Sequence, residues 1–113
     1  GMWSMMQYKK PEDWVLATGE SHTVKEFLET AFSLLGLNWE EYVLTSERYL
    51  RPNEVDYLLG DPSKAKKNLN WEPKTNFQEL VKIMVDSDIE LAKQEQLLIK
   101  ENLIKPTWEY PII

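Results

Sequence analysis

The chain has 113 residues, a formal charge of −6 and no cysteine. A chain of this length forms one domain at most, and 42% hydrophobic with 28% charged residues is an ordinary globular composition. The interspersed negative charge argues against a nucleic-acid or anionic-membrane surface. The absence of cysteine excludes disulfides, thiolate catalysis and cysteine-based zinc sites, and it agrees with a cytoplasmic protein. No apolar run approaches the roughly 18 residues of a membrane helix.

The first segments predict a short helical piece and then a strand. Residues 2–7 are apolar on several sides and resemble the end of a helix, whereas Gly1 before Met2 is typical of an expression-tag remnant. Residues 14–18 form a compact apolar run with aromatic and β-branched members, bounded by Pro11 and Gly19. This pattern favours a buried strand.

The next segment has a helical period. Apolar residues at spacings of three and four predict one continuous stripe on a helix over 24–35. Thr23 with Glu26 three residues later is the pattern of a capping box, and Gly36 supplies a left-handed stop.

Shorter elements are expected between residues 37 and 60. Asn38 with Glu41 predicts one capped turn, which is followed by a short strand over 43–45. Residues 55–59 are expected to form a second extended segment, because Pro52 disfavours helix before it and fixes its own φ.

Helices dominate the rest of the chain. Asp61 and Pro62 predict the N-cap and first residue of a two-turn helix that ends before Trp71. Asn76 with Glu79 caps an apolar stripe that reaches about Leu103 in one or two helices and drifts near residues 88–89. We therefore expect a single domain over 1–113 of mixed α/β class, mostly helical with a few short strands, in which 92–113 form a helical extension and an apolar tail.

One run concentrates the chemistry of a binding site. Residues 48–56 read Arg-Tyr-Leu-Arg-Pro-Asn-Glu-Val-Asp. A nucleotide diphosphate needs a planar, permanently charged donor for its pyrophosphate and a carboxylate acceptor for its ribose. Arg51 and Glu54 supply both groups. The competing interpretation is a screened surface ion pair worth about 0–1 kcal/mol.

These motifs together resemble the carboxyl-terminal part of the GDP-mannose 4,6-dehydratase family, which belongs to the extended short-chain dehydrogenases/reductases. The resemblance runs from about Met2 to about Leu91. It includes residues 14–20 (Trp-Val-Leu-Ala-Thr-Gly-Glu), 58–65 (Leu-Leu-Gly-Asp-Pro-Ser-Lys-Ala) and 70–74 (Asn-Trp-Glu-Pro-Lys), in order and at the spacing of the family.

The resemblance implies a function and specific residue roles. The family enzyme is a lyase of nucleotide-sugar metabolism that converts GDP-mannose to GDP-4-keto-6-deoxymannose with a tightly held NADP. The arginine of its Arg-Pro-x-Glu motif reaches the pyrophosphate and the glutamate reaches the guanosine ribose, which implies these roles for Arg51 and Glu54. Arg48 and Tyr49 match adjacent family positions and are lesser candidates for the substrate site.

The other half of the family pattern does not occur in this sequence. The chain has no glycine-rich dinucleotide fingerprint and no Tyr-x-x-x-Lys pair. We expect a substrate-binding region without the amino-terminal Rossmann half, with no cofactor site, no catalytic residue and no metal site of its own. Its partners would be GDP-mannose and either a second copy of the chain or the missing half. The alternatives are a fragment of another nucleotide-sugar enzyme and a non-catalytic helical interaction module.

Other candidate catalytic residues have simpler explanations. His22 is the only histidine and lies beside the Thr23 cap, so we expect it to be a solvent-facing cap neighbour and not an acid or base. Two pairs of carboxylates are also candidates for proton transfer: Asp86 with Asp88, and Glu40 with Glu41. The two members of each pair point to different faces of an expected helix, so we expect solvated surface residues and not a catalytic pair.

Overall fold

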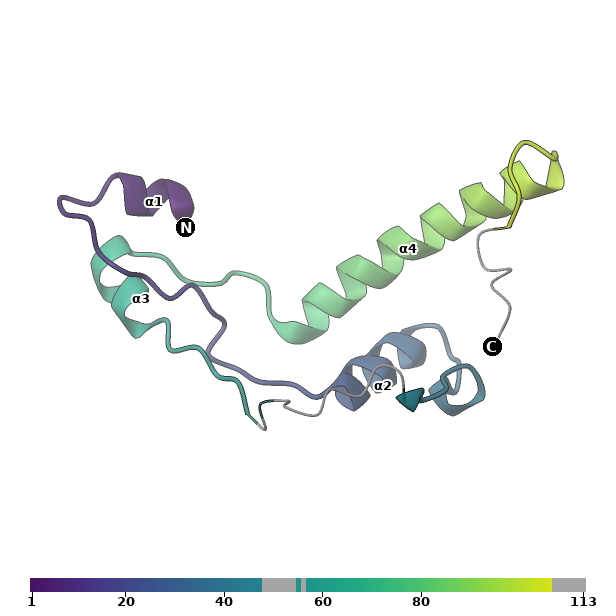
Figure 1. The fold of residues 1–113 in the computed structure, drawn as a ribbon, viewed down its shortest axis with the longest axis horizontal. Coiled ribbons are helices and arrows are strands. Elements are labelled where there is room, and N and C mark those ends of the chain that lie inside the picture. The colour runs from purple at the N-terminus through teal and green to yellow at the C-terminus, as the bar shows by residue number, and fades with distance from the viewer. Residues whose placement is uncertain (48–54, 56, 107–113) are drawn as a thin grey trace.

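A computed structural model describes residues 1–47, 55 and 57–106. The regular elements assigned within these residues are all helices, and Figure 1 shows how they are arranged. They are α1 (Met2–Met6), α2 (Val24–Leu34), the 3-10 helix η1 (Trp39–Glu41), α3 (Ser63–Leu69) and α4 (Phe77–Lys100). Helices α1 and α3 lie at one end of the molecule and α2, η1 and α4 at the other, with extended stretches of chain between them. No described helix is long and apolar enough to cross a membrane.

Helix α2 is closed at both ends as predicted. The Thr23 hydroxyl accepts a hydrogen bond from the Glu26 N–H at 3.1 Å, and the Glu26 carboxylate accepts one from the Thr23 N–H at 2.7 Å. At the other end Gly36 has φ +66°, and the Leu37 N–H donates to the Phe32 carbonyl at 3.0 Å. The chain therefore leaves α2 through the left-handed turn that glycine favours.

Helix α4 is the longest element, and its N-terminus repeats the same device. Asn76 Oδ1 accepts from the Glu79 N–H at 2.9 Å, and Glu79 Oε2 accepts from the Asn76 N–H at 3.0 Å. The helix runs unbroken for 24 residues, so the drift of its apolar stripe marks no break. It ends at Lys100, and the chain turns away at Asn102, whose φ is +57°, with the Leu103 N–H donating to the Leu98 carbonyl at 2.9 Å.

Helices α2 and α4 pack against each other near their N-termini. Val81 of α4 is fully buried. The His22 ring stacks on Phe77, with ring centroids 3.8 Å apart and planes 12° from parallel. Its two ring nitrogens lie 3.4 Å from a Glu20 carboxylate oxygen and 3.6 Å from a Glu26 carboxylate oxygen. The sequence indicated the cap but not this stack, which joins residues 55 positions apart.

Helix α3 begins one residue later than predicted. Its first helical residue is Ser63, and Pro62 occupies the N-cap position. Asp61 still satisfies the helix start, because its carboxylate accepts hydrogen bonds from the Ser63 N–H at 2.9 Å and from the Ser63 hydroxyl. These bonds lower the pKa of Asp61. The helix ends at Leu69, before Asn70 with φ +50°, and it contributes the fully buried Ala65.

The predicted strands are the main error. None of the described residues in 14–18, 43–45 or 55–59 forms a strand, so the part of the chain that the structure describes is helical and not α/β. A strand needs a neighbouring backbone to complete its hydrogen-bonded ladder. Gly60 packs against residues 15–17, but no backbone ladder joins these segments. Val15 remains 51% exposed.

The molecule exposes far more surface than a compact protein of its mass. Its radius of gyration is 19.5 Å, against about 13 Å expected for a compact domain of this length. Its accessible surface is 10559 Å², against about 6,500 Å² for a folded monomer of 13.4 kDa. Among the described hydrophobic residues only Ala65 and Val81 are buried. The chain therefore leaves most of its apolar side chains without cover.

The capping box of α2 predicts an acid-sensitive helix. The backbone hydrogen bond from Thr23 is the largest cause that holds the pKa of Glu26 below its ordinary value of 4.5. A carboxyl group whose pKa is lowered by folding stabilises the folded state above its unfolded pKa, and this contribution is lost as the pH falls through the folded pKa. We expect the amide signals of residues 24–27 to lose helical character on acidification from about pH 6 to about pH 3.

The matched control is on the same helix. Glu26→Gln should remove most of this pH dependence, whereas Glu29→Gln, which removes only the ion pair with Lys25, should retain it. NMR chemical shifts of the two variants make the comparison. Equal pH profiles in both variants would contradict the role of the capping carboxylate.

Candidate functional site

The predicted substrate residues Arg48, Tyr49, Arg51 and Glu54 all lie outside the described residues. The structure does describe the residues on both sides of them, up to Glu47 and from Tyr57 onward. Glu47 and Tyr57 are therefore the described residues that border the predicted site in the sequence.

The downstream flank is held by a close backbone approach. A Cβ atom on Gly60 would lie 2.5 Å from the Ala17 Cβ and 3.3 Å from Val15 Cγ1, so only glycine fits here without movement. Residues 14–20 and 58–65, two of the landmark motifs, thus lie side by side. This contact fixes the position of Gly60, which lies six residues after Glu54 in the sequence.

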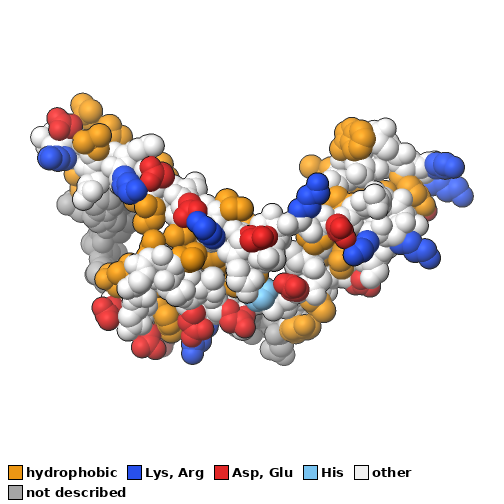
Figure 2. Space-filling model, turned by 180° about the vertical axis from the view of Figure 1, so that it is seen from behind, with side chains coloured by type: hydrophobic (Ala, Val, Ile, Leu, Met, Phe, Trp, Pro, Cys, Tyr) orange, Lys and Arg blue, Asp and Glu red, His pale blue; other side chains and the backbone are white. Residues whose placement is uncertain are grey.

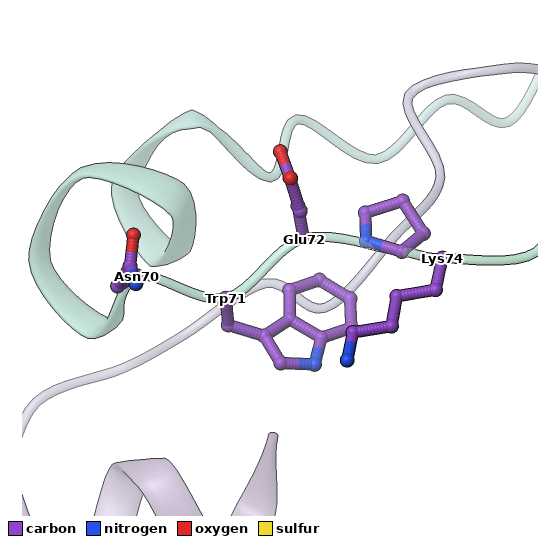
Figure 3. A pocket seen from close by; sticks show the side chains of 5 residues that line it. Asn70, Trp71, Glu72 and Lys74 are labelled. Atoms are coloured by element: carbon purple, nitrogen blue, oxygen red, sulfur yellow. The ribbon is translucent and has the colours of Figure 1, made fainter.

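The third landmark motif forms a hollow of about 640 Å³, lined by Asn70, Trp71, Glu72, Pro73 and Lys74 (Figure 3). Figure 3 shows the Lys74 side chain running back toward the Trp71 indole, with Glu72 on the other side of the backbone. Glu72 is not available as a free charge, because its carboxylate lies 2.9 Å from the Lys66 ammonium. Their hydrogen bond lowers the pKa of Glu72 and raises the pKa of Lys66.

A smaller hollow of about 280 Å³ adjoins this one and shares Pro73 and Lys74 with it. Its remaining wall joins the end of the first landmark motif to the N-terminus of α4: Thr18, Glu20, Thr75, Asn76 and Glu79. Lys74 lines both hollows and has no ion-pair partner among the described residues, so it supplies an unpaired positive charge to both. The three landmarks therefore converge in space.

The described residues offer binding groups but no catalytic set. They contain no cluster of three or more His, Cys, Asp or Glu that could hold a metal ion. His22 is stacked on Phe77, and its polar contacts are to the carboxylates of Glu20 and Glu26. Asp86 pairs with Lys82 along the surface of α4. Hydrogen bonding and charge recognition are what this arrangement can supply.

The comparisons with known proteins identify the family. The sequence model described as "GDP-mannose 4,6 dehydratase" matches residues 1–84, which include all the landmark motifs. The chain belongs to the GDP-mannose 4,6-dehydratase family. It is 59% identical over 97 residues to "GDP-mannose 4,6 dehydratase 1" of Arabidopsis thaliana, 50% identical over 109 residues to the Dictyostelium discoideum protein and 43% identical over 109 residues to the Homo sapiens protein.

These matches cover most of this chain but little of each relative. They include 86%, 81% and 81% of the chain, and 27%, 31% and 29% of the Arabidopsis, Dictyostelium and human proteins. The chain thus spans less than a third of the length of these relatives. The resemblance drawn from the motifs is confirmed at the level of the family.

The described residues do not fit the NADP that the resemblance to the family implies. Dinucleotide sites place the pyrophosphate at a glycine-rich helix N-terminus. Here the N-termini of α2 and α4 are each closed by their own carboxylate, Glu26 and Glu79, and neither follows a Gly-x-Gly sequence.

The contact at Gly60 predicts a specific steric effect. Gly60→Ala should destabilise the packing of residues 57–61 on residues 15–17 by about 1–3 kcal/mol, because the new methyl group overlaps the Ala17 Cβ. Urea denaturation followed by tryptophan fluorescence measures the change.

The double variant Ala17→Gly/Gly60→Ala provides the control. It moves the methyl group from one segment to the other and should recover part of the lost stability, which is a non-additive effect expected only for residues in contact. Simple addition of the two single effects would show that the segments are not packed as described.

Proposed function

We propose that this chain is the carboxyl-terminal, GDP-sugar-binding portion of a GDP-mannose 4,6-dehydratase. The match of residues 1–84 to the family is the observation that carries the proposal. The portion belongs to the extended short-chain dehydrogenase/reductase fold without its Rossmann half. The complete lyase would convert GDP-mannose to GDP-4-keto-6-deoxymannose in the cytoplasm.

Arg51 and Glu54 are the proposed substrate contacts, with Arg48 and Tyr49 beside them. The guanidinium of Arg51 would bind the pyrophosphate in a bidentate manner, and the carboxylate of Glu54 would accept hydrogen bonds from the ribose hydroxyls. The match of residues 1–84 to the family, which includes these positions, supports this assignment.

The chain alone would bind and would not catalyse. Catalysis requires groups that act on the reacting atoms, and the described residues supply none of the hydride or proton chemistry. Activity would need the nucleotide-binding half of such an enzyme, which positions NADP against the sugar.

Nucleotide binding tests the proposed site. We expect GDP and GDP-mannose to bind with similar dissociation constants of about 1 mM or weaker, since a partial site loses translational and rotational freedom for few contacts. Arg51→Ala should cost about 1.5–3 kcal/mol and abolish detectable binding. Arg51→Lys should also bind poorly, because one ammonium cannot reproduce the planar donor pair. NMR titration measures these affinities.

Glu54→Gln separates the two contacts. It should weaken GDP, which carries the ribose, and leave pyrophosphate binding at Arg51 unchanged. If the three variants keep the wild-type affinity for GDP, the assignment is wrong. If GDP causes no shift in wild type, the helical interaction module becomes the better explanation.

Self-association is the second expected property, because the uncovered apolar surface needs a partner. Figure 2 shows apolar side chains exposed at both ends of the molecule. On α1, Met2, Trp3 and Met6 are 78%, 76% and 81% exposed. The surface excess of this one chain over a compact monomer is about 4,000 Å². It exceeds the share of about 1,000–2,500 Å² that each partner contributes to most obligate interfaces. We propose that a second copy or the missing amino-terminal half covers this surface.

Sedimentation velocity at several concentrations measures the association of the isolated chain. Trp3→Glu should weaken it by placing a charge in the apolar surface of α1, whereas Gln94→Glu, which adds the same charge at an exposed polar site on α4, should have little effect. A strictly monomeric wild type that binds no hydrophobic dye would contradict the proposal of an uncovered interface.

A further inference from the structure

A third hollow lies beside α3, and none of its lining residues belongs to the landmark motifs. It has a volume of about 480 Å³ and is lined by Gln7, Tyr8, Lys9, Lys10, Glu12 and Asn68. All six residues belong to the described part of the chain. The stretch from residue 7 to residue 12 forms one wall, and Asn68 near the end of α3 forms the other.

The wall that carries the lysines is held in place by several contacts. Tyr8 meets Trp14 edge to face, with ring centroids 4.9 Å apart and planes at 83°. Lys64 of α3 lies 2.9 Å from the Glu12 carboxylate, donates to the Asp13 carbonyl at 2.9 Å and lies 4.7 Å from the centre of the Trp14 ring. The loop is therefore fastened to α3 through residues 12–14, and Tyr8 is joined to this segment by its contact with Trp14.

The charges around the hollow favour an anion. Lys64 neutralises Glu12, the one acidic residue in the lining. Lys9 and Lys10 have no carboxylate partner among the described residues, and the side-chain amides of Gln7 and Asn68 have no hydrogen-bond partner there. The hollow thus combines two unpaired cations with two free amide donors in a chain whose net charge is −6.

We propose that this hollow binds the phosphate group of a small phosphorylated molecule. A phosphate dianion accepts charge-assisted hydrogen bonds from ammonium groups and further bonds from amide N–H groups, which are the two donor types present. The volume of the hollow, about 480 Å³, is many times the roughly 30 Å³ that one water molecule occupies in the liquid, so it exceeds the volume of a phosphate group of five heavy atoms. The hollow therefore has room for part of the attached molecule. This proposal does not depend on the assignment of Arg51 and Glu54.

Inorganic pyrophosphate is the probe, added to the 113-residue chain at constant ionic strength with chloride as the balancing anion. NMR follows the side-chain amide signals of Gln7 and Asn68, which report on this hollow and not on residues 51–54. We expect saturable shifts of both signals. The double variant Lys9→Gln/Lys10→Gln should bind at least about tenfold more weakly, a change of about 1.4 kcal/mol.

Two controls separate this site from general charge and from the proposed substrate site. Lys67→Gln/Lys105→Gln removes the same charge from two lysines outside the hollow and should bind as wild type does. Arg51→Ala should also leave the Gln7 and Asn68 shifts unchanged. The proposal is overturned if pyrophosphate moves neither amide signal, if the two double variants lose affinity equally, or if shifts occur only around residues 51–54.

A macromolecular ligand is a separate outcome of the same series. A phosphoserine peptide that shifts the two amides while pyrophosphate and a small phosphate ester do not would overturn the assignment to a small molecule. Preserved dispersion of the amide spectrum in each variant shows that the fold is retained.

Discussion

Hydrogen bonds that close helix ends hold this structure together, because the chain has little hydrophobic interior to do so. Thr23 with Glu26 and Asn76 with Glu79 begin the two longer helices, and left-handed residues end them. With Val81 and Ala65 as the only buried hydrophobic residues among those described, local interactions set where each helix begins and ends. Packing then decides only how the helices meet.

This dependence on local interactions explains what could be predicted from the sequence. A capping box occupies four consecutive residues and an apolar helical stripe repeats every three or four, so both are visible in a single segment. The sequence therefore predicts the helices and the single turn at Asn38, with most boundaries within about one or two residues, the usual uncertainty of helix ends. The exception is the end of α4, which lies at Lys100 and not near Leu103.

Contacts between segments distant in the sequence were harder to predict. Residues 14–18 have the composition of a strand, but a strand also needs a backbone alongside it, and the sequence of one segment does not specify that neighbour. The stack of His22 on Phe77 was missed for the same reason. The landmark motifs identified the family, whereas the roles of Arg51 and Glu54 stay a prediction because these residues lie outside the described structure. The hollow that contains Lys9 and Lys10 could not be predicted either, because it forms between residues 7–12 and Asn68 of α3, which are distant in the sequence.

The same stack has a mechanical consequence. Helix α4 spans 24 residues, which corresponds to a length of about 36 Å. Its contact with α2 lies at the N-terminal end, where Phe77 meets His22 and Val81 is buried. A rotation of about 10° at this base displaces the far end of a rod of that length by about 6 Å. The position of Lys100 is thus set by the packing at the base of α4, where the His22–Phe77 stack and the buried Val81 lie, so small rearrangements between α2 and α4 become large displacements at the far end of the helix.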